Sequence, residues 1–587
     1  MPYSAPVSQI ARTLARISKL DELEATGAFP NFSADLVGPI LDEANKLARD
    51  VLAPLNPIGH KTGAKLTDKG VVAAPGFADA YAQFRDGGWM GLAFPEEYGG
   101  QGLPKVLALA VMEMVHGANM AFGLCPLLTF GAIEALIAHG SDELKKTYLP
   151  KLISGEWTGA MNLTEPQAGS DVGALKTKAV PNGDGSYAIT GQKIFITWGD
   201  HDMTENVIQL VLARLPDAPA GSKGISLFVA PKFFVNPDGS LGERNAFRCI
   251  GLEHKMGIHG SPTCVMEYSG AKGWLVGEPH KGLAAMFTMM NSARLNVGLE
   301  GVAVGEAALQ AAVAYARDRK QGSAPGVEGS AAIIRHPDIQ RTLATMAANV
   351  QAARAICYAC GAAADIAEHG AEDAVRARAK LREDVLTPLA KAWSTDRAIE
   401  VTNSGVQVHG GMGFMAETAA AQLYLDARIT PIYEGTNGIQ AIDLVGRKLG
   451  MGDGAGLAGL VAEAREIGRE ARAVNEAGFG AVAERLDAAA GALEGATRWM
   501  QQAMKERRET GLAGASAYLR LAGDVAGGMY LTRSALDARG DVDAAQALGL
   551  ARFFADDTLS RAPGSVAGIT AASEALTAAG AALWDQG

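Results

Sequence analysis

Residues 431–440 read Pro-Ile-Tyr-Glu-Gly-Thr-Asn-Gly-Ile-Gln, a stretch with one carboxylate, Glu434, set among apolar and glycine residues. The glycines indicate a turn. A carboxylate with few polar neighbours has little water to share its charge, and desolvation raises its pKa. A raised pKa suits a general base that works near neutral pH. Because most Glu residues beside a glycine are solvated turn residues, this stretch predicts a catalytic base only in combination with other motifs.

Three further motifs accompany this turn. Residues 162–171 read Asn-Leu-Thr-Glu-Pro-Gln-Ala-Gly-Ser-Asp, residues 191–197 read Gly-Gln-Lys-Ile-Phe-Ile-Thr, and residues 407–414 read Gln-Val-His-Gly-Gly-Met-Gly-Phe. Each alone is weak evidence, since the first is a turn and the second a strand. Together, and in this order, the four motifs resemble the acyl-CoA dehydrogenase family of flavoproteins, strongly over about residues 35–450.

The hydrophobic pattern divides the chain into four parts. Helical spacing fills residues 35–155, short β-branched and aromatic runs follow Asn162, and helical spacing returns at Gly282. A glycine-rich joint at residues 450–456 precedes an Ala-rich helical tail. We predict a mainly α protein with a central β domain, an antiparallel barrel or sandwich, in which Pro388 kinks a bundle helix. The predicted domains are an N-terminal helical domain (1–160), a middle β domain (161–281), a helical bundle with the base (282–450) and an additional C-terminal helical domain (457–587). This is also the order that the resemblance implies.

Composition excludes several classes of function. The 587 residues carry a formal charge of −11, which argues against a nucleic-acid partner. Five scattered Cys suit a reducing compartment, and the N-terminus lacks the continuous apolar block of a secretory signal. The most apolar stretch, residues 106–140, is interrupted by charged residues and predicts buried helices rather than a membrane span. We expect a soluble cytoplasmic protein. Cys357 and Cys360 indicate a core pair, and the ten His residues show no ligand spacing, so no metal site is expected.

The resemblance implies a reaction and its catalytic residues. Family members remove the α proton and the β hydride of an acyl-CoA thioester, and Glu434 matches their base. The backbone N–H of Glu434 is implied to bind the thioester carbonyl oxygen, where charge develops. Some relatives place the base one residue before a substrate-binding Arg, which here is Arg294, but Ala293 has no proton acceptor. Arg294 is implied to contact the coenzyme A side of the substrate, with Ser170 and Gly435 as further substrate contacts.

The resemblance also implies the cofactor FAD. The β-domain positions that face the flavin are Thr164, Gly169, Ser170, Phe195 and Thr197, and Thr436 and Asn437 follow the base in the flavin-contacting turn. Arg319, Gln407, Gly410 and Gly411 match positions that reach the FAD of a neighbouring subunit, so a homo-oligomer, a dimer or tetramer, is expected. Two departures weaken these contacts: a loop without aromatics, residues 322–330, follows Arg319, and Gly438 stands where relatives often have Gln. No Gly-x-Gly-x-x-Gly follows a strand, so a Rossmann dinucleotide site has no support.

Residues 198–206, together with the long termini, are similar to a bacterial subgroup whose substrate is 3-(methylthio)propanoyl-CoA, in dimethylsulfoniopropionate degradation. Its product is 3-(methylthio)acryloyl-CoA, and an electron-transfer flavoprotein is the expected electron acceptor. The alternatives are a short- or medium-chain acyl-CoA dehydrogenase and an acyl-CoA oxidase. A DNA-protecting flavoprotein of the same fold would need a basic tail, whereas residues 460–587 hold 17 Asp plus Glu and 13 Lys plus Arg.

Overall fold

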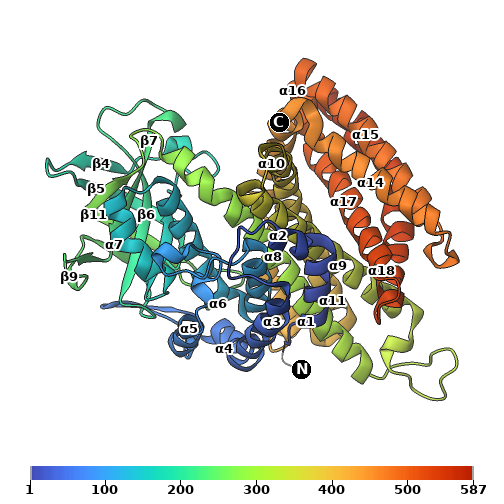
Figure 1. Ribbon diagram of the computed structural model, residues 1–587. Helices are drawn as coiled ribbons and strands as arrows, with labels where there is room; N and C mark the ends of the chain where they lie inside the picture. Colours follow the sequence, from blue (N-terminus) through green and yellow to red (C-terminus); the bar gives the residue numbers. More distant parts are fainter. Residues whose placement is uncertain (1–2, 585–587) are drawn as a thin grey trace.

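The computed structural model describes residues 3–584, and a β barrel lies to one side of a large helical body (Figure 1). The first part of the chain consists mainly of helices. They are α1 (Val7–Thr13), α2 (Leu20–Ala25), α3 (Val37–Lys46), α4 (Ala53–Thr62), α5 (Phe77–Asp86), α6 (Lys105–His139) and α7 (Asp142–Ile153), with a hairpin of β1 (Lys65–Thr67) and β2 (Gly70–Val72) after α4. Non-helical backbone at Asn119 divides α6 into two helical segments.

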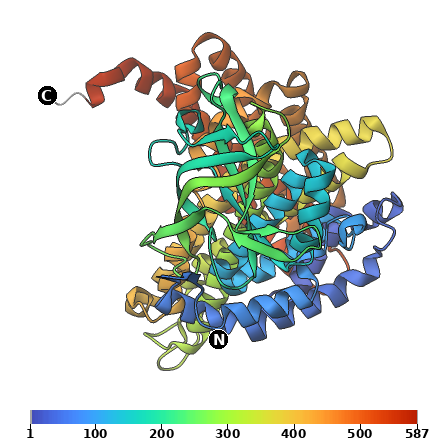
Figure 2. The ribbon, with the colours of Figure 1, turned by 90° about the vertical axis from the view of Figure 1, so that its left-hand side faces the viewer.

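The strands of the β domain close into a barrel. They are β3 (Trp157–Asn162), β4 (Lys178–Pro181), β5 (Tyr187–Thr197), β6 (Asn206–Arg214), β7 (Ile225–Pro231), β10 (Phe247–Leu252) and β11 (Thr263–Val276), with a separate hairpin of β8 (Phe233–Val235) and β9 (Leu241–Arg244). The ring runs β11–β5–β4–β6–β7 and returns to β11. Closure leaves few unpaired strand edges. Figure 2 looks onto this barrel with the helices behind it.

Long helices form the third part of the chain. They are α8 (Gly282–Asp318), α9 (Pro337–His369), α10 (Asp373–Pro388), α11 (Ser394–His409), α12 (Ala419–Ala427) and α13 (Asn437–Gly446). A π-helical turn, η9 (Leu389–Trp393), joins α10 to α11. Gly298 of α8 lies against this turn so closely that a Cβ there would stand 2.3 Å from the Ala390 carbonyl oxygen. The contact brings Lys391 of η9 beside α8.

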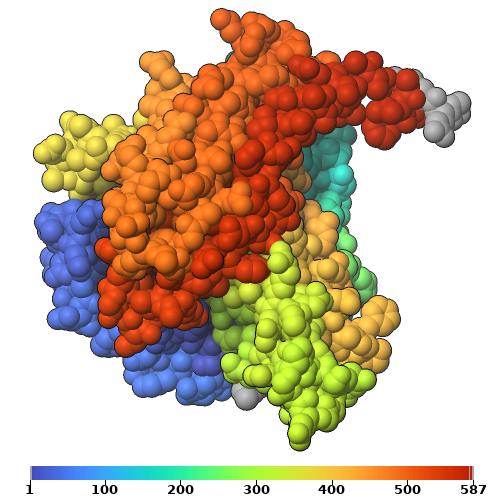
Figure 3. Space-filling view, turned by 90° about the vertical axis from the view of Figure 1, so that its right-hand side faces the viewer, coloured from blue at the N-terminus to red at the C-terminus, as the bar shows by residue number. Residues whose placement is uncertain are grey.

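The C-terminal part covers one face of the bundle with helices (Figure 3). They are α14 (Ala455–Val474), α15 (Val482–Glu506), α16 (Arg508–Ala513), α17 (Ala515–Asp537), α18 (Ala544–Asp557), α19 (Ala562–Ile569) and α20 (Ala571–Ala579). The Trp393 Nε1–H donates to Asp524 of α17 at 2.9 Å. Arg16 of the N-terminal segment reaches Asp541 at 2.7 Å and Asp543 at 2.8 Å. The C-terminal helices are therefore tied to both the bundle and the N-terminus.

Two helices, α6 and α8, are long and apolar enough to cross a membrane by length and composition. Within the protein, 83% and 72% of their most apolar windows are buried. Both therefore serve as core helices, as predicted for residues 106–140.

The predicted fold class is confirmed, and two details refine it. The barrel is not wholly antiparallel, because β4 runs parallel to β6 and β3 adds a parallel strand outside the ring. At Pro388, where a kink was predicted, α10 ends and the chain passes directly into the π-helical turn with its backbone dihedrals still helical. Proline lacks a backbone N–H and cannot continue an α-helical hydrogen-bond ladder.

Candidate active site

Glu434 lies in the connection between α12 and α13 with a left-handed backbone, φ 52°, followed by Gly435 at φ 84°. For a residue other than glycine this conformation costs about 1–2 kcal/mol, so the surroundings must hold it. The Gln440 side-chain amide donates to the carbonyl oxygens of Glu434 (3.4 Å) and Gly435 (3.2 Å). The Thr436 hydroxyl caps α13 by accepting from the N–H of Ile439 at 3.2 Å. The turn that carries the carboxylate is therefore fixed from its C-terminal side.

The backbone N–H of Glu434 donates no hydrogen bond to any described residue. A free N–H beside a half-buried carboxylate can bind the oxygen of a ligand while the carboxylate accepts a proton from the same ligand. Burial raises the pKa of Glu434, although the charges of Arg294 and Lys391 oppose this rise. The raised pKa is what a general base requires near neutral pH.

Arg294 is almost fully buried, at 4% exposed, on α8. Its guanidinium lies 3.4 Å from the carboxylate of Asp443, and its Nε–H has no partner among the described residues. Burial lowers its pKa, but an arginine remains charged. A Cβ added at Gly435 would stand 3.9 Å from Arg294 Nη2. The structure therefore places a buried cation with an unused donor beside the predicted base.

The side chain of Asn437 points into the bundle. Its Oδ1 accepts from Lys391 Nζ at 2.9 Å, and its Nδ2 donates to Asp396 at 2.7 Å and to the Ala392 carbonyl oxygen at 3.1 Å. Its amide hydrogen-bonding capacity is largely used by η9 and α11. As a flavin contact Asn437 stays a prediction, and the structure gives it the further role of fastening the turn.

The predicted flavin-facing loop is anchored by a buried ion pair. Lys193 Nζ donates to Glu165 Oε1 at 2.9 Å and to the Leu163 carbonyl oxygen at 3.0 Å. Burial alone would raise the pKa of Glu165, but the Lys193 ammonium and hydrogen bonds from Lys176 and Thr177 hold it at about 2. The carboxylate is thus ionised at neutral pH and keeps the loop against β5.

The polar groups predicted to meet the flavin are unengaged. The hydroxyls of Thr164, Ser170 and Thr197 make no hydrogen bond within residues 3–584, and a Cβ added at Gly169 would meet nothing within 4 Å. Phe195 is 58% exposed with φ 59°. An exposed aromatic ring, three free hydroxyls and an open glycine are groups that suit a planar, polar-edged cofactor. FAD would be held here by these residues.

The residues predicted to reach a neighbouring subunit's FAD lie elsewhere. Arg319 follows the C-terminus of α8, 25 residues after Arg294, which is about 37 Å along a helix. The Arg319 side chain of a chain therefore lies far from that chain's own Glu434 turn, which Arg294 adjoins. Gln407, Gly410 and Gly411 are exposed at the end of α11, beside Phe414, which is 85% exposed. These four predicted contacts remain available to a second chain.

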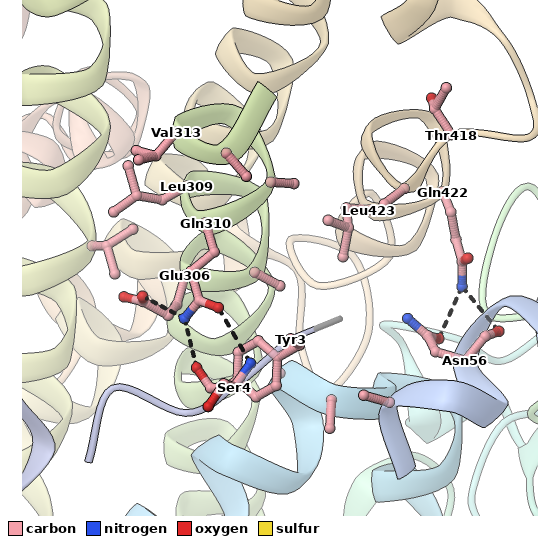
Figure 4. A pocket seen from close by; sticks show the side chains of 18 of the residues that line it. Tyr3, Ser4, Asn56, Glu306, Leu309, Gln310, Val313, Thr418, Gln422 and Leu423 are labelled. Atoms are coloured by element: carbon pink, nitrogen blue, oxygen red, sulfur yellow. Dashed lines mark hydrogen bonds between the residues drawn. The ribbon is translucent and has the colours of Figure 1, made fainter. Parts of the chain in front are cut away.

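Two cavities contain none of the predicted site residues. The larger, about 1630 Å³, lies between the N-terminal segment, α4, α8, α9 and residues 416–423. Figure 4 shows the Gln310 amide bridging Ser4 and Glu306 in its wall, with Gln422 donating to Asn56 on the other side. The second cavity, about 720 Å³, lies between α6, α8, α9 and α10. Cys357 and Cys360 are buried and free, as predicted for a core pair.

The sequence reasoning missed Glu300, Tyr433 and Lys391, which lie around the turn that carries Glu434. Glu300 and Lys391 are each 0% exposed. A signal was present, because each is a lone charge in an apolar run, residues 295–304 and 389–393. Charged side chains are almost never fully buried unless they are paired or functional.

Four family models match successive parts of the chain. The family models of the acyl-CoA dehydrogenase N-terminal, middle and C-terminal domains match residues 40–156, 160–271 and 280–449, respectively. An acetyl-CoA dehydrogenase C-terminal-like domain matches residues 460–579.

Individual relatives agree with these matches. A 3-methylmercaptopropionyl-CoA dehydrogenase of Ruegeria pomeroyi is 45% identical, over 99% of this chain and 100% of the relative. A butyryl-CoA dehydrogenase of Syntrophomonas wolfei is 38% identical over 75% of this chain and 74% of its own length. The crystal structure of a Bacillus anthracis acyl-CoA dehydrogenase complexed with FAD has the same fold, with a TM-score of 0.75 and 23% identity over 92% of this chain and 88% of that one.

The domain matches and the full-length relative show that this protein is an FAD-dependent acyl-CoA dehydrogenase. The chain belongs to the acyl-CoA dehydrogenase family.

Proposed function

We propose that this enzyme oxidises 3-(methylthio)propanoyl-CoA to 3-(methylthio)acryloyl-CoA in dimethylsulfoniopropionate degradation. The observation that carries the reaction is Glu434, whose carboxylate and free backbone N–H lie in one strained turn. The relative that shares 45% identity over 99% of this chain supports the choice of acyl group.

Glu434 removes the α proton of the thioester. The ionised carboxylate accepts this proton, and burial favours the neutral form that results. The α proton is acidic enough only when the thioester oxygen is polarised. The N–H of Glu434, which has no partner in the described structure, supplies a donor for that oxygen.

The β-domain residues would hold the cofactor. Thr164, Ser170 and Thr197 supply hydroxyls for its polar edge and phosphates, and Phe195 supplies an aromatic surface. When bound, FAD supplies an oxidised ring that accepts the β hydrogen as hydride. Glu165 and Lys193 keep the loop in place for this contact.

Arg294 binds the coenzyme A side of the substrate. Its unpartnered Nε–H and its buried charge favour an oxygen-rich ligand, since hydrogen bonds from a charged donor are about twice as strong as neutral ones. Its charge also lowers the pKa of Glu434, which keeps part of the base ionised despite burial.

Anaerobic addition of substrate to the FAD-loaded enzyme tests this proposal. A thioether differs from a methylene mainly in polarisability, so the preference over butanoyl-CoA should be modest, about ten- to two-hundredfold. We expect 3-(methylthio)propanoyl-CoA to bleach the yellow flavin band faster than butanoyl-CoA does. Equal rates would remove the substrate assignment, and bleaching by neither would remove the reaction.

A second candidate is a short- or medium-chain acyl-CoA dehydrogenase, favoured by the 38% identity to a butyryl-CoA dehydrogenase. The same experiment separates the two, because butanoyl-CoA would then react faster. An oxidase would consume oxygen during turnover, which an oxygen electrode detects.

We further propose an electron-transfer flavoprotein as electron acceptor, a homo-oligomeric assembly and a cytoplasmic location. The exposed residues Gln407, Gly410 and Gly411, with the exposed ring of Phe414, support a contact with a second copy. Sedimentation of the FAD-loaded protein tests the assembly, and a monomer would contradict it.

A further inference from the structure

A second carboxyl group lies directly behind the catalytic turn. Glu300 of α8 is fully buried, six residues or about 1.7 helical turns beyond Arg294. The hydroxyl of Tyr433, the residue that precedes Glu434, donates to Glu300 Oε2. The other oxygen, Oε1, has no partner in the described part of the chain. Among the described residues, Tyr433 is thus the only side chain that hydrogen-bonds to this buried carboxyl group.

A buried amine holds the other end of the same turn. Lys391 of η9 donates to Asn437, three residues after Glu434, and is itself 0% exposed. Two ionisable side chains therefore hold the turn. Glu300 binds Tyr433 just before the base, and Lys391 binds Asn437 three residues after it.

We propose that Glu300 is a positioning residue for Glu434: its carboxyl group fastens Tyr433 and so holds the base in its strained, left-handed backbone conformation. The inference rests on the proposed role of Glu434 as the base. It adds a residue that does not touch the substrate yet controls the rate.

The strain at Glu434 explains why such a fastening is needed. With φ at 52° the turn relaxes unless both sides are held. On the N-terminal side, the N–H of Tyr433 bonds to the Ile429 carbonyl oxygen at 3.2 Å, and within residues 3–584 the bond to Glu300 is the only hydrogen bond made by its side chain. Loss of that bond leaves the Tyr433 side chain held by packing alone.

The charges around Glu300 give the role a measurable pH signature. Burial raises the pKa of Glu300 to about 8, against the hydrogen bond from Tyr433, and burial lowers the pKa of Lys391 to about 7. Tyr433 and Glu434 face Glu300 from the turn and Lys391 faces it from η9, while Asp396 of α11 and Arg294 of α8 act on Lys391. Glu300 is therefore neutral at pH 7. Above about pH 8 it ionises and places a second negative charge beside the base, which disfavours the ionised form of Glu434.

The test measures the limiting rate of flavin reduction in FAD-loaded Glu300→Leu, Glu300→Gln and Tyr433→Phe across pH 6–10. We expect Glu300→Leu and Tyr433→Phe to slow reduction by about 10- to 100-fold with substrate affinity unchanged, because a displaced base misses the α proton. The double variant should be no slower than either single one. Gln accepts the same hydrogen bond but cannot ionise, so Glu300→Gln should recover most of the rate and lose the alkaline limb.

Tyr358→Phe is the matched control, because Tyr358 makes the same kind of buried bond, to Glu113 Oε2 at 2.6 Å, in a separate network. An equal rate loss in Tyr358→Phe, additive effects in the double variant, or an unchanged alkaline limb in Glu300→Gln would overturn the inference. If Glu434→Gln retained turnover, the base assignment itself would fail. This outcome is distinct from the results of the Glu300 and Tyr433 variants. Should Glu300→Leu not fold, the Glu300→Gln pH profile and Tyr433→Phe still decide.

Discussion

Replacing Glu434 with Gln should abolish catalysis while keeping the shape of the turn. A positioned general base contributes about 10²- to 10⁴-fold, and no neighbouring group can substitute for it. Ala293 has no acceptor atom, Glu300 is turned toward Tyr433, and Lys391 is bound to Asn437. We therefore expect the upper end of the range, a loss of about 10⁴-fold, which corresponds to about 5.4 kcal/mol of transition-state stabilisation.

The same substitution should not weaken the fold. Burial raises the folded-state pKa of Glu434, so its contribution to stability is complete below the unfolded-state pKa and is lost as the pH rises through the folded-state pKa. At neutral pH the wild-type carboxylate therefore carries a desolvation penalty that the neutral amide lacks. Glu434→Gln should unfold at the same or a slightly higher temperature than wild type.

The assay combines anaerobic stopped-flow bleaching of the flavin with a thermal unfolding curve at pH 7. Glu434→Asp is the graded control, because it keeps the charge but withdraws the carboxylate by one methylene, and about a 10- to 100-fold loss is expected. Residual turnover of Glu434→Gln within about tenfold of wild type would refute the reasoning. A lower melting temperature would refute the account of its burial.

Three further predictions concern other ion pairs. Arg294→Ala should raise KM, and it should shift the acid limb of the pH–rate profile to higher pH because the cation that lowers the pKa of Glu434 is gone. Arg447→Ala, at an exposed arginine, is the control. An unchanged KM would make Arg294 structural. Glu165→Gln should release FAD more readily than wild type. Because the folded-state pKa of Glu165 is lowered to about 2, wild type alone should lose stability and FAD as the pH falls below about 4. Equal release of FAD from the two proteins at each pH, followed by FAD fluorescence, would contradict this. Arg16→Ala should lower the free energy of unfolding by about 1–2 kcal/mol, between the values for exposed and buried pairs, and identical denaturant midpoints would contradict it.

The fold followed from the sequence because its signals are local. Helical spacing before Asn162 and after Gly282, and β-branched runs between them, report which faces are buried, and the structure has helices and strands in those places. The closure of the barrel and its parallel pair, β4 with β6, depend on contacts between strands that no local pattern records.

The site was predictable only in part for the same reason. Glu434 and Arg294 belong to motifs, whereas Glu300 and Lys391 acquire their meaning from contacts over 133 and 46 residues of sequence. The left-handed backbone of Glu434 was also hidden, because its residue type does not require that conformation. Neither the long-range contacts nor the left-handed backbone changes the hydrophobic periodicity of the sequence.

The bond between Arg16 and the two aspartates after α17 has a consequence for biosynthesis. Arg16 leaves the ribosome more than five hundred residues before Asp541 and Asp543 are made. Its ion pairs can therefore form only when translation is nearly complete. A nascent chain stalled before Asp541 would lack these ion pairs, and its first helices would be held by their other contacts, among them those with α6 and α9.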